Sequence, residues 1–343
     1  MPPLRWGVVS AGTTAHDFVC AVSTLPESDH KVVAVAAKGL DNVQKFAELH
    51  GIAAFHVGYE ALARDHNVDI VYIGAVNTVH YELAIMMLDA GKHVLCDKPL
   101  CVNEGQSKAL LDYAREKKLF CMEGMWSRFF PAYSHLRERI KKDDLGDIKE
   151  IKMELGFPIS KVERIRMGHL GGGTVLDLGV YNIQLALWVF QKFPDEIVAE
   201  GKLNEENVDT EMNVKLRFPC GGVAHMKTSG VKQLSNEAII TGTEGKITLY
   251  DFWCPIELTD IDGTVRSYPL ANSKIECILK NSVGLRYEAE ECRKRIMTGE
   301  LESPIMAHKD SLDVARVLDN IRKQIGIEYA EDFIFKPKRD SLK

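Results

Sequence analysis

The 343-residue chain has the composition of an ordinary globular protein, with 45 % hydrophobic and 27 % charged residues, and its length predicts two domains. The formal net charge of −6 at pH 7 argues against a nucleic-acid partner, because such proteins usually present a basic face. No apolar run approaches the ~20 residues of a membrane-spanning helix, so we expect no membrane partner.

The eight cysteines contain no Cys-x-x-Cys pair, and several lie in apolar runs where a thiol behaves as a small hydrophobe. This spacing disfavours both a zinc site and a disulfide framework. The amino terminus shows no apolar signal-peptide core. We therefore expect no metal and a reducing, cytoplasmic setting.

The chain opens with a predicted strand over residues 5–9, a turn of small residues and a helix to about residue 25. The turn is a degenerate form of the dinucleotide fingerprint G-x-G-x-x-G/A, in which Ser10 replaces the first glycine. Gly12 keeps the position where the backbone approaches a pyrophosphate. A plain tight turn would look similar. The candidate cofactor-binding residues here are Ser10, Gly12, Thr13 and Thr14.

A second strand is predicted over residues 31–37, and Lys38 follows it. In NAD-binding proteins an acidic residue near this point accepts the ribose hydroxyls, and none is present. A lysine suits a 2′-phosphate, so the sequence predicts NADP rather than NAD. The alternative is a solvated lysine before a capping box formed by Asp41 and Gln44.

A third strand, residues 69–73, leads to Asn77 and to a helix over residues 80–90 that Gly91 ends. The next strand, residues 93–96, stops at Asp97-Lys98-Pro99. Proline has no N–H for the ladder and forces the preceding residue into an extended conformation. Lys98 is therefore expected at the carboxyl end of a strand, where open α/β sheets bind ligands. The alternative is a lysine in an ordinary surface turn.

A cap pair, Asn103 and Gln106, opens a further helix, and residues 119–123 form the next predicted strand. Alternating strands and helices predict an α/β domain with a doubly wound parallel sheet over residues 1–125. From residue 126 the pattern changes to an α+β domain with a large open, mostly antiparallel sheet. Its predicted strands and helices are 148–157, 196–203, 211–218, 222–229, 236–249, 256–269, 285–297 and 311–325, and the basic tail 336–339 is expected to be loose.

One helix of the second domain follows three glycines, Gly171 to Gly173. Asp177 and Tyr181 lie four residues apart on its otherwise apolar face, and both need partners there. Tyr181 could simply bond a polar group of the core. The functional interpretation is a tyrosine general acid whose pKa is lowered by a nearby lysine, with Lys98 as the candidate and Asp177 completing a polar network.

Three runs of the sequence point to a known family: Val9-Ser10-x-Gly12, Trp126-Ser127-Arg128-Phe129-Phe130-Pro131 and Gly172-Gly173-x-x-Leu176-Asp177-Leu178-Gly179-x-Tyr181. On these runs the chain resembles, over essentially its full length, the glucose-fructose oxidoreductase and inositol dehydrogenase (Gfo/Idh/MocA) family of two-domain NAD(P)-dependent oxidoreductases. Most members carry histidine at the position of Tyr181, whereas the dihydrodiol dehydrogenase branch carries tyrosine.

The resemblance implies NADP-dependent oxidation of a carbinol in trans-dihydrodiols of aromatic hydrocarbons or in aldopyranoses such as D-xylose. Tyr181 would exchange the substrate proton, Lys98 would orient the substrate, and Asp177 would be the supporting acid. A cis bond before Pro99 and a homodimer formed through the C-terminal sheet are also implied. The residues expected to border cofactor and substrate are Asn77, His80, Asp97, Lys98, Trp126 and Phe157.

Three departures from the family pattern bear on the substrate: Asp97 replaces a glutamate, Val76 replaces a frequent proline, and residues 158–170 match no family loop. Two alternatives stay open. One is an inositol- or glucose-type dehydrogenase that uses NAD. The other is a non-catalytic NADP-binding sensor of the same fold.

Overall fold

The computed structural model describes residues 2–334, which divide into two compact units. Within that range, the first unit comprises residues 2–100, 108–129 and 270–308, and the second comprises residues 101–107, 130–269 and 309–334. The chain thus leaves the first unit and later returns to it, whereas the sequence predicted consecutive domains that divide at residue 126. The basic tail, residues 336–339, lies outside the described residues.

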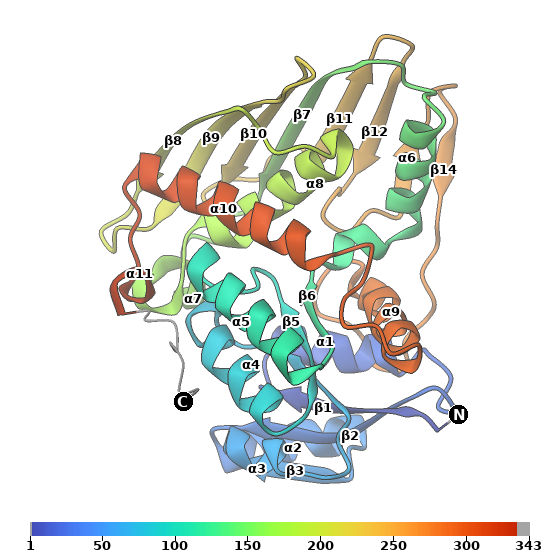
Figure 1. The fold of residues 1–343 in the computed structure, drawn as a ribbon, viewed down its shortest axis with the longest axis vertical. Helices are drawn as coiled ribbons and strands as arrows, with labels where there is room; N and C mark the ends of the chain where they lie inside the picture. Colours follow the sequence, from blue (N-terminus) through green and yellow to red (C-terminus); the bar gives the residue numbers. More distant parts are fainter. Residues whose placement is uncertain (1, 335–343) are drawn as a thin grey trace. The chain divides into compact units, whose positions relative to one another are not determined.

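The first unit contains a six-stranded parallel sheet with the order β3-β2-β1-β4-β5-β6 (Figure 1). This is the doubly wound order of dinucleotide-binding domains, and it confirms the predicted fold class. The strands are β1 (Leu4–Val9), β2 (His30–Ala37), β3 (Ala54–Val57), β4 (Ile70–Ile73), β5 (His93–Asp97) and β6 (Cys121–Gly124).

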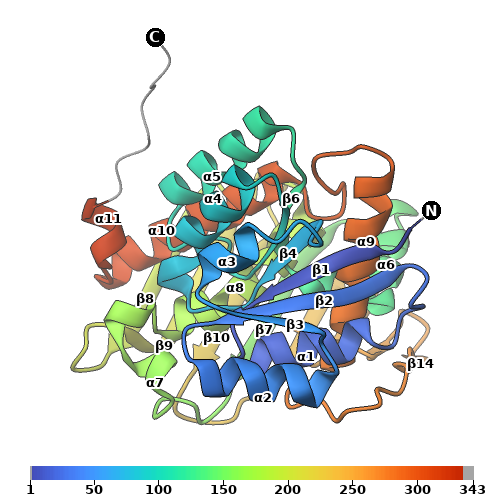
Figure 2. The ribbon, with the colours of Figure 1, turned by 90° about the horizontal axis from the view of Figure 1, so that it is seen from below.

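Helices cover both faces of this sheet, with α1 and α2 side by side on one face (Figure 2). Aromatic side chains fill the space beneath α1, where the rings of Phe18 and Tyr72 stack with centroids 3.9 Å apart. The helices of the unit are α1 (Thr13–Val22), α2 (Leu40–His50), α3 (Tyr59–Ala63), α4 (His80–Asp89), most of α5 (Glu104–Lys117) and α9 (Leu285–Met297).

Local signals explain where several of these helices begin and end. Gly51 takes the left-handed conformation after α2, and the side chain of Asn103 accepts the N–H of Gln106 at the start of α5, 2.9 Å away. The capping box of Asp41 and Gln44 is wrong: the N-cap is Gly39, and no side chain caps the helix.

The second unit contains an eight-stranded sheet with the order β14-β13-β12-β11-β7-β10-β9-β8. Its neighbours are antiparallel except for β7 and β10, which are parallel, so the sheet is mixed but mostly antiparallel, as predicted. The strands are β7 (Ile148–Gly156), β8 (Glu196–Leu203), β9 (Asp209–Arg217), β10 (Val223–Ser229), β11 (Glu237–Gly242), β12 (Lys246–Tyr250), β13 (Glu257–Thr259) and β14 (Val265–Ser267).

Helices α8 (Val180–Phe190) and α10 (His308–Ile325) cross one face of this sheet (Figure 1). Every residue of α8 is buried. The stretch Gly168–Phe190 is long and apolar enough to cross a membrane, so the expectation that no apolar run has this length is wrong. However, 94 % of its most apolar window is buried in the protein, as in a core helix. The remaining helices of the unit are α6 (Pro131–Lys141), α7 (Glu163–Arg166) and α11 (Ala330–Ile334).

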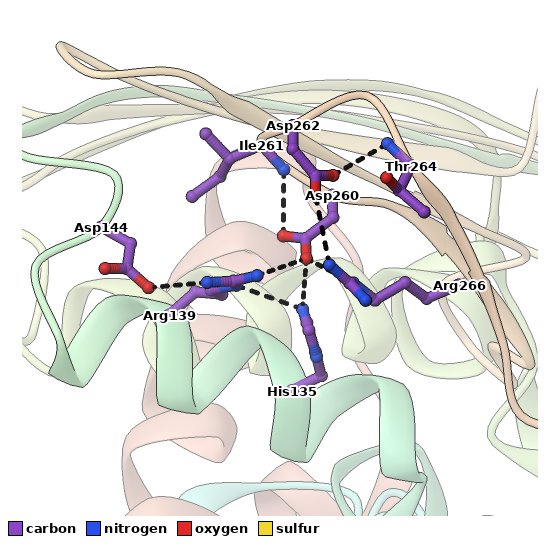
Figure 3. Close-up of polar contacts among 8 residues, drawn as sticks. All are labelled: His135, Arg139, Asp144, Asp260, Ile261, Asp262, Thr264 and Arg266. Atoms are coloured by element: carbon purple, nitrogen blue, oxygen red, sulfur yellow. Dashed lines mark hydrogen bonds and ion pairs between the residues drawn. The ribbon is translucent and has the colours of Figure 1, made fainter.

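A charged network fastens α6 to the hairpin of β13 and β14 (Figure 3). The buried carboxylate of Asp260 accepts hydrogen bonds from Arg139 at 2.7 Å and Arg266 at 2.5 Å, and it also contacts His135 at 3.0 Å. Burial alone would raise the pKa of Asp260, but the two guanidinium groups outweigh it and hold that pKa well below its usual range.

Candidate functional site

Ser10 lies at the carboxyl end of β1 with a φ of 86°, a conformation that usually requires glycine. Its hydroxyl accepts the backbone N–H of Gly12 at 3.1 Å. The serine thus keeps the backbone turn of the missing first glycine and adds a side-chain hydrogen bond inside it.

Helix α1 begins at Thr13, directly after this turn, and no side chain caps it. Thr14 packs against the backbone after β4, because a Cβ atom on Gly74 would lie 3.0 Å from the Thr14 hydroxyl oxygen. The uncapped N–H groups of the first helical turn and the adjacent glycine backbone form a fitting cradle for a pyrophosphate. The expected residues Ser10, Gly12, Thr13 and Thr14 therefore surround one turn.

Lys38 follows the last residue of β2 and is exposed. No acidic side chain stands at the end of this strand, so the ammonium group is the charge nearest in sequence to the expected ribose position. Asn77 opens a short 3₁₀ turn after β4.

The buried ring of His80 connects the ends of β4 and β5. Its Nδ1 lies 3.0 Å from the carbonyl oxygen of Pro99, and its Nε2 lies 3.0 Å from the carbonyl oxygen of Ala75. The peptide bond between Lys98 and Pro99 is cis, which confirms the expectation. Both nitrogens of His80 contact the main chain, so this side chain positions the two loops.

Side-chain carboxylates hold the turn that carries Lys98. Asp97 accepts the backbone N–H of Lys98 at 2.7 Å, and Glu123 accepts that of Leu100 at 3.1 Å. The shorter aspartate, which replaces the family glutamate, thus has a defined partner in its own turn. Trp126, which is buried, begins a short helical turn after β6 in the same unit.

In the second unit an aromatic cluster surrounds Tyr181, which is 6 % exposed at the start of α8. The ring of Trp253 lies 6.2 Å from that of Tyr181 and meets Phe157 edge to face at 5.7 Å. Phe157 was expected at the site from the sequence, whereas Trp253 was not. We call these residues, Phe157, Tyr181 and Trp253, the aromatic cluster.

Asp177 lies in a π-helical turn, Val175–Gly179, that leads into α8. Its carboxylate accepts a hydrogen bond from Arg164 of α7 at 2.8 Å. Arg164 belongs to the loop that matched no family pattern, and it was not anticipated. This loop packs so closely against the backbone before α8 that only glycine leaves enough room. A Cβ atom on Gly172 would lie 2.5 Å from the carbonyl oxygen of Ile165.

Asp209, which is fully buried, fixes the start of the same segment. Its carboxylate accepts hydrogen bonds from the Thr174 hydroxyl and from the Val175 N–H at 3.0 Å. Burial raises the pKa of Asp209 to about 6, although these donors oppose the shift. These bonds fix Thr174 and Val175, at the start of the segment that carries Asp177 and Tyr181.

Comparison with known families matches both parts of the chain. Residues 4–125 match the model of an oxidoreductase family with an NAD-binding Rossmann fold, GFO_IDH_MocA. Residues 133–248 match the GFO/IDH/MocA C-terminal domain. The chain belongs to the Gfo/Idh/MocA family.

Relatives in this family match almost the whole chain. It is 38 % identical to trans-1,2-dihydrobenzene-1,2-diol dehydrogenase of Danio rerio, covering 96 % of this chain and 99 % of that protein. The dehydrogenase of the same name from Homo sapiens is 37 % identical, again covering 96 % of this chain and 99 % of that protein. The family resemblance inferred from the motifs is therefore confirmed.

Solved structures agree with the Gfo/Idh/MocA fold. A 3-ketoreductase from Actinomadura kijaniata, in complex with NADP and TDP-benzene, superposes with a TM-score of 0.80 at 24 % identity, covering 94 % of this chain and 98 % of that one. A levoglucosan dehydrogenase in complex with NADH and levoglucosan gives 0.82 at 22 % identity, covering 94 % and 97 %. A nucleotide-binding Rossmann domain is thus shown for this Gfo/Idh/MocA member.

Proposed function

We propose that this protein is an NADP-dependent dehydrogenase that oxidises a carbinol of trans-dihydrodiols of aromatic hydrocarbons and of aldopyranoses such as D-xylose. The observation that carries the proposal is the aromatic cluster, in which Tyr181 stands beside Trp253 and Phe157. Flat apolar rings suit a cyclohexadiene diol or the face of a sugar, and a phenol suits exchange of a hydroxyl proton. The dihydrodiol dehydrogenases that are similar over nearly the full length support this substrate class.

The turn around Ser10, the uncapped start of α1 and Lys38 would hold the dinucleotide. The bound nicotinamide supplies the hydride acceptor. In our proposal Tyr181 removes the hydroxyl proton from the carbinol, and Lys98 orients that hydroxyl and favours the phenolate. Asp177, paired with Arg164, supports the same proton exchange.

The choice of NADP rests on Lys38. An acidic residue at the end of β2 would repel a 2′-phosphate, whereas the exposed ammonium group attracts one. An NAD-dependent sugar dehydrogenase is the alternative that this residue disfavours.

The test is turnover by the purified protein, followed by the absorbance of the reduced cofactor. The protein is given NADP⁺ or NAD⁺ with benzene trans-dihydrodiol, D-xylose, D-glucose or myo-inositol. We expect NADP⁺-dependent turnover of the dihydrodiol and of xylose. Replacement Tyr181→Phe should lower kcat by about 10²- to 10⁴-fold, the usual contribution of a positioned acid or base.

Tyr250→Phe is the matched control, because Tyr250 lies in the same unit and its hydroxyl contacts only Thr259 among the contacts described. Tight NADP(H) binding without turnover of any of the four compounds would replace the proposal with a nucleotide-binding sensor. Turnover of inositol or glucose with NAD⁺ alone would favour the second alternative.

We also propose a homodimer formed through the second sheet. The face opposite α8 and α10 carries a groove of about 790 Å³ across β7, β8, β9, β10 and β11. Side chains of both charge signs border it, including Lys152 and Glu154, and Val198 is 52 % exposed there. Such a mixed surface suits a second copy of itself. Sedimentation should give a dimer, and Val198→Glu with Lys152→Glu should yield a monomer.

A further inference from the structure

Three metal-ligating side chains meet in the first unit, and none of them belongs to the site described above. His16 and Cys20 lie on α1, and His50 is the last residue of α2. One donor atom from each lies within 4.8 Å of the other two. We call these residues the His/Cys cluster. The third member comes from a different helix, and only one of the three is a cysteine, so the spacing of the cysteines gave no sign of the cluster.

The contacts within the cluster use both ring nitrogens of His16, so one ion would take a single nitrogen of His16 together with Cys20 and His50. The Nε2 atom of His16 lies 3.6 Å from the Sγ atom of Cys20. With Zn–N and Zn–S bonds of about 2.0 and 2.3 Å, two ligands of a tetrahedral zinc ion stand roughly 3.5 Å apart. Three donor atoms that lie within 4.8 Å of one another would therefore move closer together around an ion. The two residues are four positions apart on a helix, so their side chains share one face.

His50 approaches the other ring nitrogen of His16 from α2, with its Nε2 atom 3.0 Å from Nδ1. His16 also contacts the carbonyl oxygen of Glu276 through Nε2 at 3.0 Å. An ion bound through Nδ1 of His16 would replace the contact between the two imidazoles, and Nε2 would keep the Glu276 carbonyl as the partner that orients the ring, as in many metal sites.

Hydrogen bonds to a buried carboxylate fix the backbone next to the cluster. The carboxylate of Asp17, which is fully buried on α1, accepts the backbone N–H groups of Ile278 and Leu279, both at 2.8 Å. These bonds hold the loop that carries Glu276 against the helix. Cys20 is buried, while His16 and His50 are half-buried.

We propose that His16, Cys20 and His50 bind a zinc ion that ties α1 to α2. Two imidazoles and a thiolate select borderline transition metals over Mg²⁺ or Ca²⁺, which prefer oxygen ligands. The ion would fasten the helix that begins at the Ser10 turn. The site is structural, so the substrate chemistry proposed above does not depend on it.

The test uses the full-length protein after treatment with a chelator, titrated with Co²⁺ or Zn²⁺ alone. We expect one equivalent of Co²⁺ to give the visible spectrum of a tetrahedral site with a sulfur-to-cobalt charge-transfer band, and Zn²⁺ to displace it. Zn²⁺ should also raise the thermal midpoint, because an ion that binds only the folded state stabilises it.

Replacement of His50 by glutamine should weaken binding more than about tenfold, and Cys20→Ser should abolish the charge-transfer band. Because Cys20 is buried, the half-buried His50 provides the variant that is expected to fold. The controls are Cys220→Ser and His225→Gln, which alter a cysteine and a histidine of the second unit. Equal binding by His50→Gln and the native protein would overturn the proposal. The thiol of Cys277 interacts with that of Cys20, so recovery of the two in a disulfide, with no metal bound, would also overturn it.

Discussion

The Nδ1 atom of His80 lies 3.0 Å from the carbonyl oxygen of Pro99, and this contact joins the start of α4 to the turn after β5. The turn carries Lys98, so the imidazole fixes a residue of the proposed site. A phenyl ring would keep the shape but lose both contacts to the main chain.

We therefore expect His80→Phe to lower the free energy of unfolding by about 1–3 kcal/mol, because the buried carbonyl oxygen of Pro99 and the part-buried one of Ala75 lose their contacts with the ring. The value of kcat should fall as well, since the turn that holds Lys98 loosens. Urea unfolding and steady-state kinetics measure the two effects. Glu82→Gln, on the exposed side of the same helix, is the control and should change neither. Unchanged stability in His80→Phe would contradict this role.

The positive φ of Ser10 predicts different results for three substitutions. Ser10→Gly removes the strain and the hydrogen bond to Gly12 together, so stability should change little. Ser10→Ala keeps the strain and loses the bond. Ser10→Val should cost the most, roughly 1–2 kcal/mol or more, because a β-branched residue tolerates this conformation poorly. Urea unfolding ranks the variants, and a valine variant as stable as the glycine variant would contradict the backbone argument.

Lys38→Asp should shift the cofactor preference toward NAD. The introduced carboxylate repels the 2′-phosphate of NADP and can accept hydrogen bonds from the ribose hydroxyls of NAD. We expect the ratio of kcat/KM for NADP⁺ over NAD⁺ to fall by at least about tenfold, which corresponds to about 1.4 kcal/mol. Lys45→Asp, an equally exposed change on α2, should leave the ratio unaltered. A similar fall in both variants would point to a general charge effect.

Because the pKa of Asp209 is raised in the folded protein, we expect the protein to lose stability as the pH rises. Its pKa is raised to about 6 in the folded protein, above that of an unfolded aspartate, so the folded state holds the proton more tightly. The stabilisation is complete below about pH 4 and disappears as the pH passes through about 6. Relative to Asp209→Asn, the native protein should lose about 3 kcal/mol over this window. Unfolding at several pH values measures the difference, and a pH-independent difference would contradict the prediction.

For Asp260 we expect the opposite pH dependence, in which the folded protein loses stability as the pH falls. Its pKa is held down by Arg139 and Arg266 against the effect of burial, so its contribution is present above about pH 4 and declines on further acidification. Asp260→Asn removes the carboxylate that two partly exposed guanidinium groups share, and we expect it to cost roughly 1–3 kcal/mol at neutral pH. The same comparison at lower pH should give a smaller cost. A constant cost would show that packing, rather than charge, explains it.

Strong periodic signals made much of the fold predictable. The helix at Leu285–Met297 and the strand at Glu196–Leu203 have the predicted bounds, because apolar spacing and flanking turns agree there. Strand β3 was missed because it is short and half-exposed. Residues 236–249 were taken as one strand, but a turn near Gly245 divides them into β11 and β12, and the β-rich composition of both halves hid the break.

The positions of the candidate site residues in the fold were predictable where a backbone feature marks them. Proline fixed the position of Lys98, and the glycines before α8 marked the segment of Tyr181. Trp253 and Arg164 were missed because each meets its partner through the folded chain, one from a turn after β12 and the other from an unfamiliar loop. The spacing of residues along one sequence does not show which distant residues come into contact in the folded chain.

The return of residues 270–308 to the first unit has a consequence for synthesis and for fragments of the chain. On the ribosome, the sheet of this unit emerges long before α9 and the loop that Asp17 binds, so its last pieces arrive only after the whole second sheet has been made. A recombinant fragment that ends at residue 125 would leave the buried Asp17 carboxylate and the apolar side of α1 uncovered. We expect such a fragment to aggregate, and a fusion that supplies residues 270–308 through a short linker to remain monomeric and bind nucleotide.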